Sequence, residues 1–243
     1  MKQDAKAKKL AALLKKIKAK KSPQEAPPRN ATMQLVMAFL QWQATRKQAE
    51  EAIEVLLDEM VDVNELRVSH PHEILEVLPE DYPLAQERIL RMGEALNEVF
   101  KREHGIEMGS AESKTKKDQR VYLETLPGVP PYVVAQVMLL AFGGHAMPVD
   151  EKLVALLAKE GVAESYDASP AEVEAYLLRH IKAGDTVEAH LLLQAWSDSL
   201  KMPAAPKAAS KAAPKAAPKA APKAAPKKKT TRRSTTAAAK KKK

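Results

Sequence analysis

Apolar residues in the middle of the chain recur at helical spacing. Between residues 31 and 200, Leu, Val, Ile, Met and Ala return every three or four positions, which is typical of helices that bury one face. No segment shows the strict alternation expected of a half-buried strand. The pattern therefore predicts an all-α fold, with helices over 33–40, 52–60, 72–78, 84–100, 131–142, 149–159, 169–181 and 186–200 and a further short helix before Leu126.

Capping and turn residues delimit several of these helices. Ser169 followed by Pro170 is a helix start, because Ser accepts from the first free amides and Pro is tolerated at the first helical position. Gly143 and Gly144 are expected to end the apolar helix over 131–142. The polar, Lys-rich residues 107–118 are expected to form a loop.

The N-terminal segment has a different pattern. In residues 1–22, Leu10, Leu13, Leu14 and Ile17 recur at helical spacing among many lysines, which predicts a basic amphipathic helix. Such a helix can lie on the DNA backbone, on a membrane surface or in a groove of a partner protein, and the basic C-terminus favours DNA. A solubilising arm is the remaining interpretation. Residues 22–29 contain three prolines and are expected to form a linker.

Residues 203–243 are of low complexity. Lys-Ala-Ala-Pro recurs with a period of four, and such regular proline prevents a helix while no apolar surface is available to bury. We expect a disordered polycation, similar to the tails of linker-histone-like proteins, that binds DNA phosphates without sequence preference. A tail that only confers solubility is the alternative. Its candidate DNA-binding residues are Lys211, Lys215, Lys219, Lys223, Arg232 and Arg233.

The charge is distributed very unevenly along the chain. Residues 1–30 carry ten Lys/Arg and two acidic residues, and residues 201–243 carry fifteen Lys/Arg and no acidic residue. Because the whole chain has a net charge of +9, residues 31–200 carry −14. A polyanion would therefore be attracted mainly by the two ends. The expected organisation is a basic arm and linker over 1–30, a helical domain over 31–200 and a DNA-binding tail over 201–243.

Several classes of site and location are excluded by the composition. The chain has no cysteine, so disulfides, Cys-ligated zinc and iron–sulfur clusters are ruled out, and no cofactor is expected. The six histidines lack the spacing of zinc ligands, so no metal site is expected. No apolar run approaches the ~20 residues needed to span a bilayer. We expect a cytoplasmic, nucleoid-associated monomer.

Two stretches carry a more specific signal. One is Leu40-Gln41-Trp42-Gln43-Ala44-Thr45, and the other contains Leu126-Pro127-Gly128-Val129, Ala141-Phe142-Gly143 and Pro148-Val149-Asp150. Together they resemble the helix-hairpin-helix DNA glycosylases of the endonuclease III superfamily, whose hairpin precedes an aspartate at a matching interval. The resemblance covers residues 31–200.

The resemblance implies two helical lobes with double-stranded DNA crossing the groove between them. Asp150 would stabilise the cationic sugar formed as the N-glycosidic bond breaks, and Tyr132 would line the base pocket. Gln43 would enter the duplex beside the extruded base, and Gly128 and Val129 would shape a phosphate-binding hairpin. The alternative interpretations are that Asp150 only caps a helix and that Tyr132 only packs.

This sequence departs from the family at two informative positions. Tyr132 stands where lyase members carry the Schiff-base lysine; a phenol cannot form an imine, although thymine-mismatch members of the family also have tyrosine there. Pro130 and Pro131 replace residues whose amides would face phosphate, and proline has no N–H.

The sequence thus supports two functions. The first is a monofunctional DNA N-glycosylase of base-excision repair, which hydrolyses the glycosidic bond without β-lyase activity. The second is a non-catalytic, architectural DNA-binding protein that retains the glycosylase fold.

Overall fold

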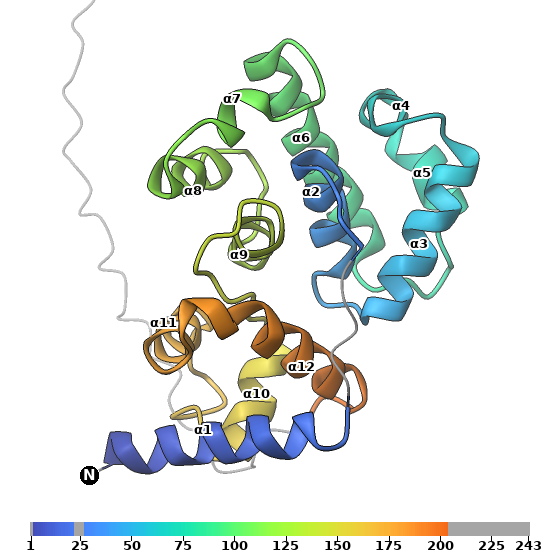
Figure 1. The fold of residues 1–243 in the computed structure, drawn as a ribbon. Coiled ribbons are helices and arrows are strands. Elements are labelled where there is room, and N and C mark those ends of the chain that lie inside the picture. The colour runs from blue at the N-terminus through green and yellow to red at the C-terminus, as the bar shows by residue number, and fades with distance from the viewer. Residues whose placement is uncertain (1, 22–26, 204–243) are drawn as a thin grey trace, which may run out of the picture. The chain divides into compact units, whose positions relative to one another are not determined.

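The computed structural model describes residues 2–21 and 27–203, which form helices joined by loops (Figure 1). No strand occurs in these ranges, so the predicted all-α class is confirmed. The helices are α1 (Lys2–Lys18), α2 (Ala31–Gln41), α3 (Arg46–Glu59), α4 (Val63–Val68), α5 (Pro71–Val77), α6 (Ala85–Glu103), α7 (Gly109–Glu112), α8 (Lys116–Glu124), α9 (Pro131–Leu140), α10 (Glu151–Lys159), α11 (Pro170–His180), the 3₁₀ turn η1 (Ala183–Asp185) and α12 (Thr186–Asp198).

The first lobe is built from α2 to α9 around one apolar core. Helix α2 lies at its centre and packs against α3, α6 and α9. Nearly every residue of α2 is buried, which explains why apolar side chains are spread around the helix and no charged residue occurs in it. Phe39, Leu96 and Val137 are among the fully buried side chains that these helices contribute.

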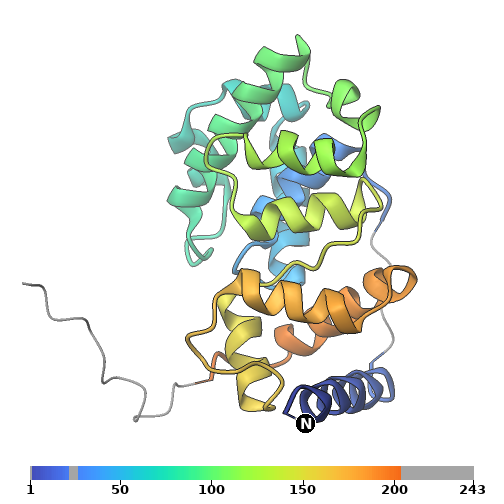
Figure 2. The same cartoon turned by 90° about the vertical axis from the view of Figure 1, so that its left-hand side faces the viewer.

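The second lobe combines α10, α11 and α12 with the N-terminal helix α1 (Figure 2). Leu10, Leu13 and Ile17 of α1 are buried in the same core as Leu157 and Leu193. The basic amphipathic helix predicted from the sequence therefore exists, but it is part of the second lobe and not a separate arm. Burying a large aliphatic side chain is worth about 1.5–3 kcal/mol, which favours docking over a detached helix.

The start of α11 is capped by the residues that the sequence predicted. Ser169 and Glu172 form a capping box at the start of α11, with Pro170 in the first helical position. Asp62 caps α4, a short helix that the apolar pattern did not predict. The segment expected to be a loop over 107–118 contains the single turn α7 and the start of α8.

Several buried polar side chains of α2, α9 and α12 lie close together. The Gln136 amide donates to the Gln41 side-chain oxygen at 2.6 Å. His190 of α12 is 3% exposed and lies beside the same small cavity as Gln34 and Arg46. Burial, and secondarily the charge of Arg46, lowers the pKa of His190 from 6.5 to about 4.

This histidine should make the fold acid-sensitive. Because the folded-state pKa lies below the unfolded one, the unfolded chain gains a proton first, and stability is lost as pH falls from about 6.5 to about 4. The loss from this group amounts to about 3 kcal/mol at its full extent. Urea unfolding at neutral pH and at about pH 4.5 should show a smaller acid loss for His190→Gln than for the parent chain. Equal losses would contradict this assignment.

Candidate DNA-binding and catalytic site

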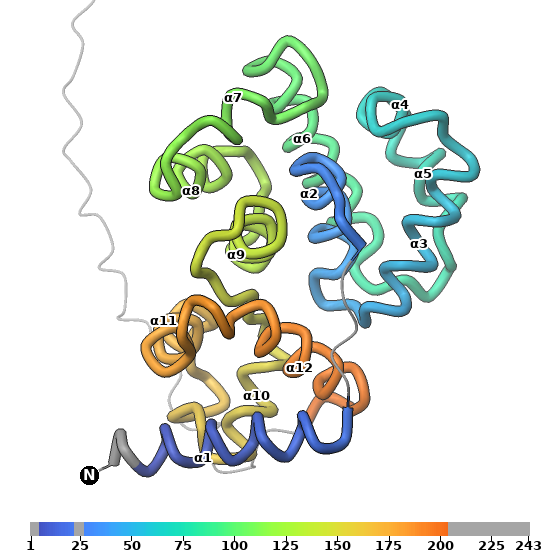
Figure 3. The backbone as a smooth tube through the Cα atoms, in the orientation of Figure 1, coloured from blue at the N-terminus to red at the C-terminus, as the bar shows by residue number. Residues whose placement is uncertain are grey.

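The predicted hairpin is formed by α8, a short turn and α9 (Figure 3). Pro130 occupies the N-cap position of α9, and Pro131 occupies the first helical position, where a missing N–H costs no helical hydrogen bond. The two prolines therefore preserve the helix start. Within residues 127–131, only Gly128 and Val129 have a backbone N–H that could donate a hydrogen bond to a phosphate, because the other three residues are prolines.

Gly128 is required at the turn for two separate reasons. Its φ is +72°, in the left-handed region that favours glycine. A Cβ at this position would also lie 3.2 Å from both Cα and Cβ of Arg91 on α6. The next residue, Val129, is half-buried against the core of the first lobe. The hairpin turn is therefore fixed by close packing on α6.

Substituting this glycine should destabilise the fold. Gly128→Ala combines left-handed strain with a backbone contact that cannot relax freely, at an expected cost of about 1–3 kcal/mol. Gly93→Ala in α6 is the matched control, because a Cβ there meets no atom within 4 Å. That control should stabilise the helix by about 0.5–1 kcal/mol. Thermal unfolding of both variants tests the prediction, and similar melting temperatures would contradict it.

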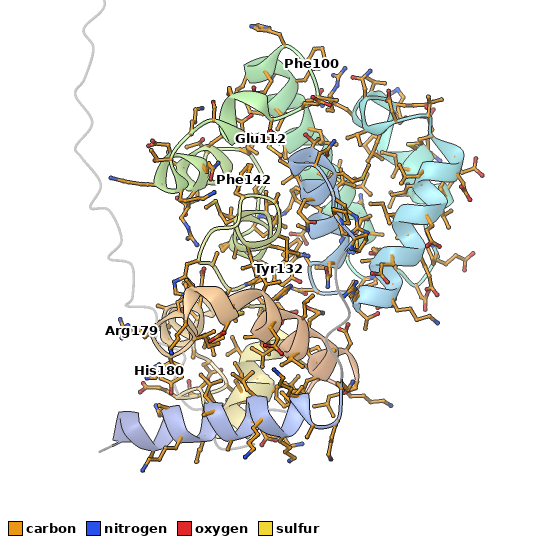
Figure 4. All side chains as sticks on the ribbon, viewed as in Figure 1. Phe100, Glu112, Tyr132, Phe142, Arg179 and His180 are labelled. Atoms are coloured by element: carbon orange, nitrogen blue, oxygen red, sulfur yellow. The ribbon has the colours of Figure 1, made fainter. Side chains whose placement is uncertain are left out.

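Tyr132 lies in the first turn of α9 and points toward the second lobe (Figure 4). The side chain is 4% exposed, and its hydroxyl lies 3.4 Å from Oε1 of Gln194 on α12. Burial raises its pKa well above 10, and the negative charges of Asp150 and Asp198 raise it further. Tyr132 is therefore a neutral phenol at physiological pH, and it lies within electrostatic reach of both carboxylates.

Asp150 is the N-cap of α10. Its Oδ1 accepts from the backbone N–H of Leu153 at 2.8 Å, and Oδ2 accepts no hydrogen bond from the described residues. The half-buried carboxyl has a raised pKa because of desolvation, which the Leu153 amide partly offsets. A carboxylate with a raised pKa is a stronger base than an exposed one. Capping thus engages one carboxylate oxygen of Asp150 and leaves the other available to a ligand.

Gln43 follows the C-terminal end of α2 and is exposed. Its φ is +56°, which is uncommon for a residue other than glycine. The side-chain Nε2 donates to Oε2 of Glu151 at 2.9 Å, directly beside Asp150. This hydrogen bond connects the Leu40–Thr45 segment with the residue that follows Asp150, 108 positions along the chain from Gln43.

A buried arginine holds the main chain just before Gln43. Arg88 of α6 is fully buried and donates to the carbonyl oxygens of Leu40, at 2.8 Å, and Trp42. Tyr82 donates to the same Leu40 oxygen at 2.6 Å, and its ring lies 4.7 Å from the Arg88 guanidinium. These contacts satisfy carbonyl groups at the end of α2, which a helix leaves without intrahelical partners.

A second arginine connects this segment with the hairpin. Arg91 Nη1 lies 3.4 Å from the carbonyl oxygen of Gly128, and the guanidinium lies 5.3 Å from the centre of the Trp42 ring. Glu87 pairs with Arg91 at 2.6 Å. Neither Arg88 nor Arg91 was identified from the sequence. Arg88 could have been noticed, because it occupies the apolar face of α6 that also carries Met92.

A second carboxylate bridges the two lobes near Tyr132. Asp198 Oδ2 accepts from the backbone N–H of Arg46, the first residue of α3, at 3.0 Å. Asp198 Oδ1 accepts from Gln194, the same side chain that contacts the Tyr132 hydroxyl. Burial raises the pKa of Asp198. The sequence offered no signal for this contact.

Gln43 thus contacts the residue after Asp150, and the charge of Asp150 acts on Tyr132. The Gly128–Val129 turn lies just before the helix that carries Tyr132. The predicted tail residues Lys211, Lys215, Lys219, Lys223, Arg232 and Arg233 lie outside the described residues. Within residues 2–21 and 27–203, no cluster of three or more His, Asp or Glu is placed to hold a metal ion. None of the helices in these ranges is long and apolar enough to cross a membrane.

Comparison with known sequences gives no relatives: no family model matches the chain, and no curated protein matches it either.

Solved structures, in contrast, match most of the chain. An 8-oxoguanine glycosylase/lyase of Clostridium acetobutylicum in complex with double-stranded DNA has a TM-score of 0.62 and 15% identity, over 81% of this chain and 70% of that chain. An endonuclease III trapped in a covalent intermediate with DNA has a TM-score of 0.61 and 19% identity, over 80% and 84%. A thermostable thymine-DNA glycosylase has a TM-score of 0.58 and 20% identity, over 78% and 86%. The chain thus has the all-α fold of the helix-hairpin-helix DNA glycosylases.

Proposed function

We propose that this protein is a monofunctional DNA glycosylase of base-excision repair. The observation that carries the proposal is the hydrogen bond from Gln43 to Glu151, the residue that follows Asp150 in the chain. Tyr132 lies near enough to Asp150 for the negative charge of that carboxylate to add to the effect of burial and raise the pKa of the phenol. The similarity in fold to glycosylases bound to DNA supports the same assignment.

Asp150 would supply the chemistry. As the N-glycosidic bond breaks, positive charge develops on the deoxyribose, and a nearby carboxylate stabilises that charge. The oxygen of Asp150 that is not engaged with Leu153 can also orient or deprotonate the attacking water. The products are the free base and an abasic site in an otherwise intact strand.

Gln43 and the hairpin would position the DNA. An extruded nucleotide leaves a gap in the base stack, and an exposed amide side chain on a left-handed turn is suited to fill it. The Gly128 and Val129 amides precede α9 and can donate to a phosphate at its N-terminal end. Arg88 and Arg91 would keep the two DNA-contacting segments at a fixed separation.

Tyr132 determines that the reaction stops at base release. A lyase step through an imine needs a primary amine at the sugar, and a phenol cannot provide one. Burial keeps this phenol neutral, so its role is to pack or to donate a hydrogen bond through its hydroxyl. The abasic strand should therefore remain unbroken until it is treated with alkali.

A single-turnover assay with four duplexes tests the proposal. The duplexes carry an oxidised pyrimidine, uracil, a thymine–guanine mismatch or an alkylated purine. We expect strand breaks for one lesion class, and only after alkali. Strand breaks without alkali would contradict the role assigned to Tyr132.

A second candidate is a non-catalytic DNA-binding protein. Its support is that Asp150 caps its own helix, while Tyr132 is almost completely buried. The two prolines of the hairpin also reduce the number of amides available to phosphate. Tight, salt-dependent binding of all four duplexes without release of any base would establish this alternative.

A further inference from the structure

A groove lies on the second lobe, between α1, the end of α10 and the residues after α12. Its volume is about 600 Å³, within the range of ligand-binding clefts. The floor is apolar, and it includes the half-buried Trp196 and two side chains that remain well exposed, Leu200 at 39% and Met202 at 57%. The apolar side chains that line it are Leu13, Ile17, Leu156, Trp196, Leu200 and Met202.

The rim of this groove is strongly basic. One acidic side chain, Glu160, accompanies five lysines along it. Lys21 is engaged with the carbonyl oxygen of Ala195 at 2.6 Å. The other four lysines are exposed, and none of them is in an ion pair with a described residue; they are Lys16, Lys20, Lys159 and Lys201.

We infer that this groove binds an acidic peptide segment, with bulky apolar side chains, of another protein. The lysine rim is complementary to several negative charges, and the apolar floor is complementary to large side chains between them. A DNA duplex presents a surface dominated by phosphates, and its few apolar groups, the deoxyribose faces and the thymine methyls, suit Leu200 and Met202 less well than bulky apolar side chains do. The chain's own residues 204–243 carry fourteen Lys/Arg and no acidic residue, so their charge opposes binding here.

The groove is separate from the candidate catalytic site. Asp150 stands at the first turn of α10, whereas Lys159 stands at the last turn, beside α1 (Figure 1). Nine helical residues at a rise of 1.5 Å put about 13 Å between the two ends. A peptide in the groove would therefore leave Gln43, Tyr132 and Asp150 free to act on DNA, so the groove can recruit a partner to the protein.

Fluorescence anisotropy with labelled peptides and the full chain tests the inference. The probe is a short peptide of Asp and Glu interspersed with Leu and Phe. One control peptide has Ser in place of Leu and Phe, and a second has Asn and Gln in place of the acids. We expect the probe to bind at least about tenfold more tightly than either control. Equal binding of the acid-only peptide would overturn the proposal, because attraction by the basic tail would then explain the affinity.

Two pairs of variants locate the binding surface. Lys16→Glu/Lys20→Glu should weaken probe binding by about tenfold or more. Lys8→Glu/Lys15→Glu makes the same charge change at exposed positions of α1 outside the groove and should change it less than about twofold. Leu200→Gln/Met202→Gln should weaken the probe but not the acid-only peptide. Equal losses in both lysine pairs would overturn the proposal.

Other occupants would be recognised in the same experiments. Direct binding of a DNA duplex that weakens about tenfold in Lys16→Glu/Lys20→Glu but not in Lys8→Glu/Lys15→Glu would identify the groove as a nucleic-acid site and overturn the inference. The inference would also be overturned if the protein bound vesicles of anionic lipid but not the probe, and if Lys16→Glu/Lys20→Glu abolished the binding to vesicles. Probe binding at a protein concentration where the chain sediments as a monomer would support it, because self-association would then not account for the signal.

Discussion

Replacing Asp150 by Asn is expected to reduce single-turnover base release by about 10²- to 10⁴-fold, the range associated with loss of a positioned base. The substitution removes the charge that would stabilise the cationic sugar while keeping the shape of the side chain. Asn is as good an N-cap as Asp, so the hydrogen bond from Leu153 can be retained. Unchanged base release in this variant would remove Asp150 from the mechanism.

The stability of two Asp150 variants shows whether a loss of base release comes from lost catalysis or from a destabilised fold. Because burial raises the pKa of Asp150, the ionised carboxyl is disfavoured in the folded state, and Asp150→Asn should be at least as stable as the parent at neutral pH. Asp150→Ala loses the cap of α10 and should be less stable by about 1 kcal/mol. Urea unfolding measures both values, and a large loss of stability in Asp150→Asn would contradict this separation.

The same carboxyl should also control the pH dependence of base release. The ionised form carries the proposed chemistry, so activity should rise with pH and level off above the pKa of Asp150. That pKa is raised above 3.8 by burial, so the rise should lie at higher pH than an exposed Asp would give. A rate that falls over the same range would indicate that the acid form acts.

A chain that ends at Pro203 is expected to bind every DNA duplex more weakly by about 100-fold or more at moderate salt. Residues 204–243 contribute fourteen positive charges, whereas residues 31–200 carry a net −14, so the domain alone has little long-range attraction for DNA. If about seven phosphates are neutralised by the tail, the slope of log affinity against log salt should change by about six.

A matched control distinguishes charge from chain length. The full-length chain with Gln in place of the fourteen Lys/Arg of residues 204–243 should behave like the truncated chain. A tail with the same composition in scrambled order should behave like the parent, since counterion release does not depend on sequence. An unchanged salt slope after truncation would show that the tail does not contact DNA.

The helices were largely predictable, but the position of α1 was not. Its pattern of Leu10, Leu13 and Ile17 among lysines suits a DNA surface, a membrane or a protein groove equally well. The partner that actually buries this face includes Leu157 and Leu193, which are far away in sequence. Periodicity identifies the apolar face of a helix, but it does not identify what covers that face.

The sequence motifs at residues 40–45 and 126–150 identified part of the candidate site. The helix-turn-helix of the hairpin was expected from its motif and is present, and Gln43 contacts Glu151, the residue after Asp150, whereas the role of Asp150 stays a prediction. The supporting contacts of Arg88 and Asp198 could not be derived, because their partners are main-chain groups. Every residue carries a backbone carbonyl, and every residue except proline carries a backbone N–H, so the sequence does not record which of these groups is recognised.

Direct detection of the released base by mass spectrometry tests the proposed function most closely. The full chain and Asp150→Asn would each be incubated in excess over the four lesion duplexes, at a concentration where all DNA is bound. The proposal predicts one class of free base from the parent chain, little or none from the variant, and an unbroken abasic strand. Absence of free base from every duplex, with all the DNA bound, would contradict it and leave a glycosylase fold that only holds DNA.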